Sequence, residues 1–324
     1  MSKTLTIFDG HYLLHRTLHL TEYQEMRSPK STPTGGLFGT LKSVRYSLSE
    51  TLSNYALFVM DGGLSPRRLK LFPEYKAHRR LPESECSAED LAYRRLFKTQ
   101  VPLVESTLPL LGVEVVSLDA VEGDDLIARL AWRWRDRDED HEVVVVSEDK
   151  DLVQLVSPRI GVFRPMAQEW VTEDTFSAFS GVETIEEYLL AKAMIGDKSD
   201  GIDGIHGVGP VRATALLAEA RGRDWKEQVQ FEHVRAIAAQ HPKKSLRQVA
   251  TEWGKIERNL GLLDIRLETF EPRAIQLIEL LVSDVQGARP KFQERAFREV
   301  AVEMGFNSLI EAWNIWVAPF RRLR

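Results

Sequence analysis

The chain has 324 residues, of which 43 are Lys or Arg and 48 are Asp or Glu, so its net charge is −5. This acidic balance argues against a nucleic-acid binder of the usual basic kind, and a hydrophobic content of 43% excludes a mainly disordered chain. The sole cysteine, Cys86, excludes a disulfide framework and a multi-cysteine zinc site.

The first predicted element is a strand over 5–8, and Asp9 follows it directly. This acid ends the apolar run before the hydrophobic core of a signal peptide forms, and no later run reaches the roughly 18 apolar residues of a membrane span. We therefore expect a soluble, cytoplasmic protein.

Three further runs rich in β-branched residues predict strands over 56–60, 113–116 and 143–146. Apolar residues recur at helical spacing over 37–52, between the first two strands, and over 126–134, between the last two. Alternating strands and helices are typical of a parallel sheet with crossover helices. We expect one α/β domain over residues 1–181.

After about residue 182 the pattern becomes helical. Helical spacing covers 185–195, 211–220, 229–240, 246–263 and 275–282, and the glycine-rich segment 202–210 interrupts it. We expect a helical domain over 182–290 and a C-terminal helical tail over 291–324.

Carboxylates follow the predicted strands. They are Asp9, Asp61, the group Glu122, Asp124 and Asp125, then Asp149 and Asp151, with Asp197 and Asp200 at the start of the helical part. Each one alone is equally a helix cap or a turn residue. Ligands of parallel sheets bind beyond the carboxyl ends of the strands, where so many acids would repel each other without cations. Oxygen ligands favour Mg²⁺ or Mn²⁺ over zinc, and such a site is typical of two-metal phosphodiester hydrolysis.

The segment 65–81, here called the basic strip, carries a net charge of +5. Two aromatic residues, Phe72 and Tyr75, lie among its cations. Cations bind phosphates and rings stack on bases, so the basic strip predicts contact with nucleic acid. A solvated loop with long cationic side chains is the alternative.

The segment 204–210 has glycines at Gly204, Gly207 and Gly209 and a proline just before the next predicted helix. Glycines allow close approach, and N–H groups at a helix start bind phosphate. This indicates a helix-hairpin-helix grip on a DNA backbone, although an ordinary turn between helices has the same composition. It is not a dinucleotide fingerprint, because Arg212 stands where the third glycine belongs.

Taken in order, these motifs resemble the 5′-3′ exonuclease or flap endonuclease family, which includes bacteriophage 5′ nucleases and the 5′ nuclease domain of bacterial DNA polymerase I. The matching stretches are Phe8-Asp9-Gly10, Met60-Asp61, Tyr75 to Arg80, Val121 to Asp125, Ser147 to Leu152, Gly196 to Asp200 and the Gly-Val-Gly hairpin. The resemblance implies a PIN-like (resolvase-like) parallel-sheet nuclease domain with a helical arch at about 64–100, plus a helical helix-hairpin-helix (H3TH) domain.

The resemblance also implies roles for single residues. A first Mg²⁺ ion would be held by Asp9, Asp61, Glu122 and Asp124, and a second would be surrounded by Asp125, Asp149, Asp151, Asp197 and Asp200. Catalytic contacts to the scissile phosphate would come from Lys76 and Arg79, a stacked terminal base would lie on Tyr75, and other DNA contacts would come from Arg16, Arg80, Gly204, Gly207, Gly209 and Arg212. Mn²⁺ would substitute for Mg²⁺ as the cofactor, and the hairpin turn would bind K⁺.

The implied activity is a metal-dependent 5′-3′ exodeoxyribonuclease and flap endonuclease that leaves 5′-phosphate and 3′-hydroxyl ends. It would act as a monomer on DNA ends, flaps or nicks, including RNA primers on DNA, in a bacterial cell or a phage-infected host. A PIN-type ribonuclease and a non-catalytic structure-specific DNA-binding protein are the alternatives. Departures from the family pattern occur at Gly123, Glu148, Gly201 and Asp203.

Overall fold

The computed structural model describes residues 3–221, 231–283 and 290–324. The chain divides into two compact units. The first is Met1–Gly63, Pro82–Trp170 and Phe270–Arg324, and the second is Leu64–Leu81 and Val171–Thr269. These units differ from the consecutive segments expected from the sequence, because 64–81 joins the helical unit and the C-terminal helices join the sheet. None of the described helices is long and apolar enough to cross a membrane.

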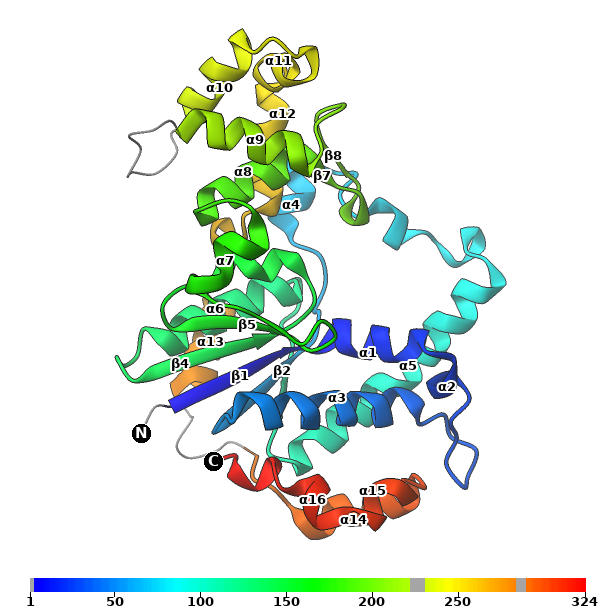
Figure 1. Ribbon diagram of the computed structural model, residues 1–324. Coiled ribbons are helices and arrows are strands. Elements are labelled where there is room, and N and C mark those ends of the chain that lie inside the picture. Colours follow the sequence, from blue (N-terminus) through cyan, green and yellow to red (C-terminus); the bar gives the residue numbers. More distant parts are fainter. Residues whose placement is uncertain (1–2, 222–230, 284–289) are drawn as a thin grey trace. The chain divides into compact units, whose positions relative to one another are not determined.

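The first unit is built on a six-stranded sheet. Its strands are β1 (Lys3–Asp9), β2 (Tyr55–Val59), β3 (Glu114–Val116), β4 (His141–Val146), β5 (Ile160–Arg164) and β6 (Glu169–Val171), in the order β3-β2-β1-β4-β5-β6. Each neighbouring pair from β3 to β5 is parallel. The parallel sheet predicted from the sequence is confirmed, with β1, β2, β4 and β5 visible side by side in Figure 1. β5 and β6 extend it beyond the four expected strands.

Helices cover both faces of this sheet. The helices of this part of the unit are α1 (Gly10–His19), α2 (Thr21–Gln24), α3 (Gly35–Thr51), α5 (Ala88–Thr107), α6 (Gly123–Arg135) and α13 (Pro272–Ser283), with 3₁₀ turns η2 (Glu83–Glu85), η3 (Leu108–Leu110) and η4 (Lys150–Leu155). Side chains alternate between faces along a strand. Phe58 and Val146 belong to the core shared with α1, α3 and α5. Tyr55 instead packs against Trp134 of α6.

The C-terminal residues complete the core of the first unit. They form α14 (Glu294–Glu303), α15 (Asn307–Glu311), α16 (Trp313–Val317) and η8 (Phe320–Arg322). The Phe297 ring stacks on Trp313 and Trp316, and Trp316 stacks on Phe320. The predicted helical tail is therefore part of the sheet unit and is held by buried aromatic rings.

The second unit is helical. It contains α4 (Pro66–Leu71), η1 (Ala77–Arg80), α7 (Glu173–Ser180), α8 (Ile185–Ile195), β7 (Gly196–Asp197), η5 (Lys198–Asp200), β8 (Ile202–Asp203), α9 (Pro210–Arg221), α10 (Phe231–Gln240), α11 (Lys244–Thr251), α12 (Trp253–Leu263) and η6 (Ile265–Leu267). The helical pattern over 246–263 is interrupted at Glu252, which separates α11 from α12. The start of the predicted helix over 229–240 lies outside the described residues.

The first turn of the basic strip is anchored inside this unit. Arg67 pairs with Glu268 at 3.1 Å, and Arg68, which is buried, donates to the carbonyl of Leu262 at 2.8 Å. A Cβ on Gly261 would lie 2.8 Å from the side chain of Leu71. Two cations that the sequence offered for DNA therefore hold α4 on α12.

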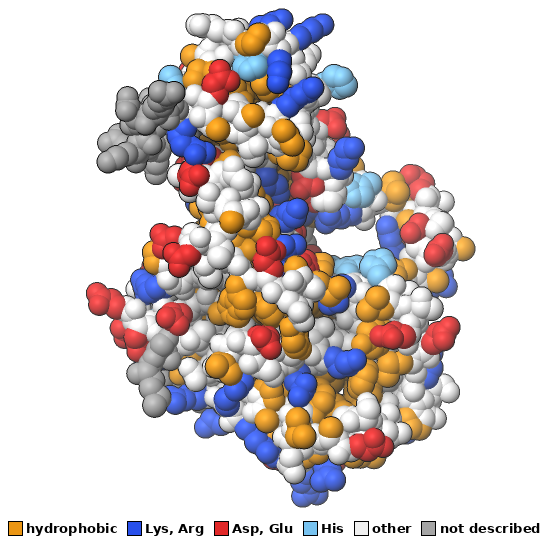
Figure 2. Space-filling model, in the orientation of Figure 1, with side chains coloured by type: hydrophobic (Ala, Val, Ile, Leu, Met, Phe, Trp, Pro, Cys, Tyr) orange, Lys and Arg blue, Asp and Glu red, His pale blue; other side chains and the backbone are white. Residues whose placement is uncertain are grey.

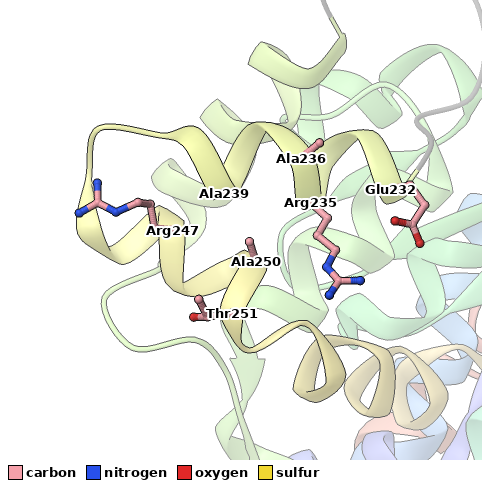
Figure 3. Close-up of a pocket in the computed structure, with 7 residues that line it drawn as sticks. All are labelled: Glu232, Arg235, Ala236, Ala239, Arg247, Ala250 and Thr251. Carbon is pink, nitrogen blue, oxygen red and sulfur yellow. The ribbon is translucent and has the colours of Figure 1, made fainter.

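A groove of about 580 Å³ lies between α10 and α11 (Figure 3). The groove is lined by three alanines and two arginines: Ala236, Ala239, Ala250, Arg235 and Arg247. Small side chains at a helix crossing leave such a space because they do not fill it. This end of the unit also carries many Lys and Arg side chains (Figure 2).

Candidate active site

Seven of the nine predicted metal ligands belong to the first unit, at the carboxyl ends of the strands. Asp9 ends β1, Asp61 follows β2, Asp149 and Asp151 begin η4 after β4, and Glu122, Asp124 and Asp125 begin α6. Three of these carboxylates are buried: Asp125 is 1% exposed, Glu122 4% and Asp9 7%. Burying a charge is costly unless it is paired or binds a metal.

Asp9 lies where the strand order reverses. Chain order runs from β1 to β2 and β3 on one side, while β4 lies on the other side of β1. Ligands of open α/β sheets bind at this switch point. The hydroxyl of Ser147, just after β4, donates to Oδ2 of Asp9 at 2.7 Å, and the backbone N–H of Tyr12 donates to Oδ1 at 3.1 Å. These two hydrogen bonds fix the Asp9 carboxylate between the end of β4 and the start of α1.

The environment of Asp9 disfavours its negative charge. Burial, opposed by the hydrogen bond from Ser147 and helped by the charges of Asp149 and Asp61, raises the pKa of the Asp9 carboxyl from 3.8 to about 7. These three carboxylates are therefore close enough to repel each other. A divalent cation would relieve this repulsion, and the oxygen-only donor set fits a hard ion.

Asp61 is held by the start of α6. The backbone N–H of Gly123 donates to its Oδ1 at 2.6 Å. A Cβ on Gly123 would lie 2.6 Å from the same oxygen, so a larger residue displaces the carboxylate or the helix. The glycine that departs from the family pattern thus permits a close contact between two proposed ligand segments.

The sequence did not lead us to predict a row of histidine and aromatic rings beside Asp61. His11, His15 and His19 follow each other at intervals of four residues on α1, and Tyr93 and Phe97 of α5 stack on them. Nε2 of His11 lies 3.6 Å from Oδ2 of Asp61. The helical spacing of the three histidines was the available signal in the sequence.

Both carboxylate oxygens of Glu148 have partners beside β5. Its Oε2 pairs with Arg164 at 3.1 Å, and its Oε1 accepts from the backbone N–H of Met166 at 2.6 Å. It therefore secures the turn between β5 and β6. Arg16, a predicted DNA contact, lies in the last turn of α1 and is half-buried.

The remaining two predicted ligands lie in the second unit. Burial acts to raise the pKa of Asp197, but hydrogen bonds from Ser199 and the charge of Lys192, 3.6 Å away, lower it overall. Asp200 lies 2.9 Å from Arg79 and 3.6 Å from Lys76. Both proposed catalytic cations are thus paired with a proposed metal ligand.

The other residues of this cluster surround Asp200. The hydroxyl of Tyr75 donates to Asp200 at 3.3 Å, and its ring is 2% exposed beneath Lys76 and Arg68. Arg80 donates to the carbonyls of Pro73 and Tyr75 within its own segment. In this conformation the Tyr75 ring is covered, and its role as a base-stacking residue stays a prediction.

The predicted hairpin, 204–210, leads from β8 into α9, and β7, η5 and β8 connect it to α8. Gly204 is required by packing, because a Cβ there would lie 2.0 Å from the carbonyl oxygen of Ile195. Gly207 has a φ of +75°, which favours glycine. A Cβ on Gly209 would meet nothing within 4 Å, so the backbone there is open to a partner.

The start of α11 adjoins this hairpin. Arg212 donates to the carbonyl of Gly207 and, at 3.4 Å, to the hydroxyl of Ser245. Lys243 and Lys244, both exposed, precede Ser245. Sequence reasoning missed these residues because nothing local indicates that 243–245 returns to the hairpin.

The chain is similar in sequence to known proteins of one family. The sequence profile of the 5′-3′ exonuclease N-terminal, resolvase-like domain matches residues 4–182. A 5′-3′ exonuclease of Aquifex aeolicus is 32% identical over 218 residues, 66% of this chain and 69% of that protein. DNA polymerase I of Treponema pallidum is 31% identical over 217 residues, but the match spans only 20% of that longer protein.

Solved structures show the same fold. A flap endonuclease of bacteriophage T5, in a pseudo-enzyme–product complex with DNA and metal ions, superimposes with a TM-score of 0.64 at 19% identity, covering 92% of this chain and 99% of that chain. A bacteriophage T5 protein co-crystallised with metal ions has a TM-score of 0.67 at 19% identity, covering 81% of this chain and 90% of that chain. At this identity the likeness concerns the fold.

Proposed function

Since the chain belongs to the 5′-3′ exonuclease family, we propose that it is a structure-specific 5′ nuclease that hydrolyses DNA at 5′ ends, flaps and nicks. The observation that carries this proposal is Asp9, a buried carboxylate at the switch point of the sheet, with Asp61 and Asp149 acting on its charge. A protein that only bound DNA would gain nothing from burying acids at this cost.

The proposed cofactor is a pair of Mg²⁺ ions, for which Mn²⁺ substitutes. Asp9, Asp61, Glu122 and Asp124 would hold the first ion, and the other proposed ligands would surround the second. Such ions lower the pKa of an attacking water and offset the charge that builds on the phosphate. The protein contributes fixed carboxylates, of which Asp9 is oriented by Ser147 and Asp61 by Gly123.

Lys76 and Arg79 would exchange partners during the reaction. They neutralise Asp200 in the structure. A scissile phosphate presents the same kind of anionic oxygen, so the two cations can move from the carboxylate to the phosphate and stabilise its transition-state charge. Asp200 would then be released to act as a ligand.

Duplex DNA would bind to the hairpin surface. We include here the open backbone at Gly209, Arg212, and the exposed start of α11 at Lys243 and Lys244. These groups address phosphates, which carry no sequence information. Because phosphates are common to both nucleic acids, RNA primers paired with DNA are proposed as substrates too. From the family resemblance, we also propose that the hairpin turn binds a K⁺ ion.

The test is cleavage of matched substrates with Mg²⁺: a 5′ flap of DNA, the same flap of RNA, and a 3′ flap. We expect cleavage of the 5′ flaps and a 5′-phosphate on the product. Cleavage of RNA alone would support a PIN-type ribonuclease, and binding without cleavage would support a non-catalytic DNA-binding protein. Either result would refute the proposal.

A further inference from the structure

The turn between α6 and β4 brings three possible metal ligands together. The carboxylates of Asp138 and Asp140 and the imidazole of His141 offer ligand atoms that all lie within 4.8 Å of one another. His141 is the first residue of β4 and pairs with Lys3 at the start of β1. This group therefore lies at the amino ends of the strands, opposite the candidate active site.

His141 is oriented as a ligand. Its Nδ1 lies 3.0 Å from the carbonyl oxygen of Trp134. A carbonyl only accepts, so Nδ1 carries a proton, and in the neutral imidazole Nε2 then presents its lone pair. The ring is stacked on Trp134 with the centroids 4.4 Å apart, which fixes its plane. Metal-ligating histidines are commonly held in this way, with the second nitrogen bonded to a carbonyl.

The other ring nitrogen, Nε2, has no hydrogen-bond partner within the described residues. His141 is 5% exposed, and its Nε2 is buried and unsatisfied. The nearest carboxylate atom recorded, Oδ1 of Asp140, lies 3.9 Å away, which is too far for a hydrogen bond. Leaving a buried polar atom unsatisfied costs free energy, and a bound cation would remove that cost.

The turn is held without using the two carboxylates. Arg159 donates to the carbonyl oxygens of Arg135 at 2.6 Å and of Asp138 at 2.7 Å. The backbone N–H of Lys3 donates to the carbonyl of Asp140 at 3.0 Å. Because the side chains of Asp138 and Asp140 are exposed, an ion can reach the group from solvent.

We propose that Asp138, Asp140 and His141 bind one divalent transition-metal ion, of the Zn²⁺ or Ni²⁺ type. The imidazole nitrogen selects such ions over Mg²⁺, and the two carboxylates match the charge of the ion. Three protein ligands leave positions for water. The bound ion ties the turn to the first residue of β4 and is separate from the nuclease cofactor.

The test titrates the full-length protein with Zn²⁺ by calorimetry, without DNA. The double variant Asp138→Asn/Asp140→Asn changes only exposed side chains, and Asp136→Asn/Glu139→Gln changes the same charge in the same turn as a matched control. We expect the first variant to bind one Zn²⁺ fewer than the wild type, or to bind it at least tenfold more weakly. The control variant should keep that ion.

Anomalous diffraction from Zn²⁺-soaked crystals locates the ion, with a peak expected at Nε2 of His141. Equal stoichiometry and affinity in the wild type and Asp138→Asn/Asp140→Asn, or no peak at His141, would overturn the proposal. Zn²⁺ ions at the active-site carboxylates would appear in all three proteins and cancel from the comparison.

Discussion

The backbone N–H of Gly123 donates a 2.6 Å hydrogen bond to Oδ1 of Asp61. The first residue of α6 thereby fixes the acid that follows β2, although 62 positions separate the two residues in the chain. A Cβ at position 123 would lie 2.6 Å from the same oxygen. This contact joins two proposed ligand segments and makes the geometry of the site depend on a glycine.

Gly123→Ala should therefore slow cleavage. The added methyl group displaces the Asp61 carboxylate, and a misplacement of about 1 Å can cost about 100-fold in rate. Gly254→Ala is the control, because a Cβ there meets nothing within 4 Å. Single-turnover rates on one flap substrate measure the effect. Equal rates for the two variants would show that Asp61 is not held as described.

Asp125→Asn and Asp151→Asn should abolish cleavage and leave DNA binding intact. Each variant removes a proposed ligand charge while keeping the shape of the side chain. Gel-shift binding and cleavage are measured on the same flap, with Asp119→Asn, an exposed acid of the same unit, as the control. Turnover that is unchanged in either variant would remove that residue from the metal site.

Lys76→Ala should mainly lower the rate of the chemical step, and Asp200→Asn should change the effect of that substitution. Lys76 and Asp200 are 3.6 Å apart, so a double-mutant cycle on single-turnover rates should be non-additive. Lys70→Ala, an exposed cation of α4, is the control. Additive effects of the two substitutions would argue against the exchange of partners.

Arg212→Ala should weaken duplex binding and reduce its dependence on salt. Loss of one phosphate contact lowers the slope of log K against log salt by about 1. Fluorescence anisotropy over a salt series measures the slope, and Arg295→Ala, exposed on α14 in the other unit, is the control. An unchanged slope would exclude Arg212 from the DNA surface.

The metal-free protein should lose stability as the pH rises from about 4 to about 7. The pKa of Asp9 is about 7 in the folded protein and about 4 in an unfolded chain, so folding favours its protonated form. The contribution of this group is therefore complete below about pH 4 and is lost as pH rises through the folded pKa.

Urea unfolding in EDTA measures this loss. The free energy of unfolding should fall between about pH 4 and pH 7 by more in the wild type than in Asp9→Asn, which cannot ionise. Added Mg²⁺ should restore the difference at the higher pH. Equal pH dependence in both proteins would mean that the burial of Asp9 does not act on its charge.

The sequence predicts those parts of the fold that local patterns encode. Runs such as Val143 to Val146 are apolar on both faces, so a central parallel strand can be recognised. The strand Ile160–Arg164 was missed because Gly161 and Arg164 dilute its apolar run. The break at Glu252 was hidden because apolar residues continue at helical spacing on both sides of it.

The positions of the seven candidate ligands in the first unit could be predicted for the same reason, since acids that follow parallel strands meet at one edge. The hydrogen-bond partners of these ligands and of the cations near them could not be predicted. Ser147 bonds to Asp9 across 138 positions, and Arg68 reaches Leu262 across 194. Contacts between distant segments decide which cations remain available to DNA, and no local spacing records them.

The measurement that tests the account most directly is a product-length map of one 3′-labelled 5′-flap DNA, with Mg²⁺ and with EDTA, for the wild type and Asp125→Asn. We predict a cut near the base of the flap in the wild type with Mg²⁺, and no product in EDTA or from the variant. Equal cleavage in EDTA, equal cleavage by Asp125→Asn, or no cleavage by the wild type would contradict the proposal of a metal-dependent 5′ nuclease.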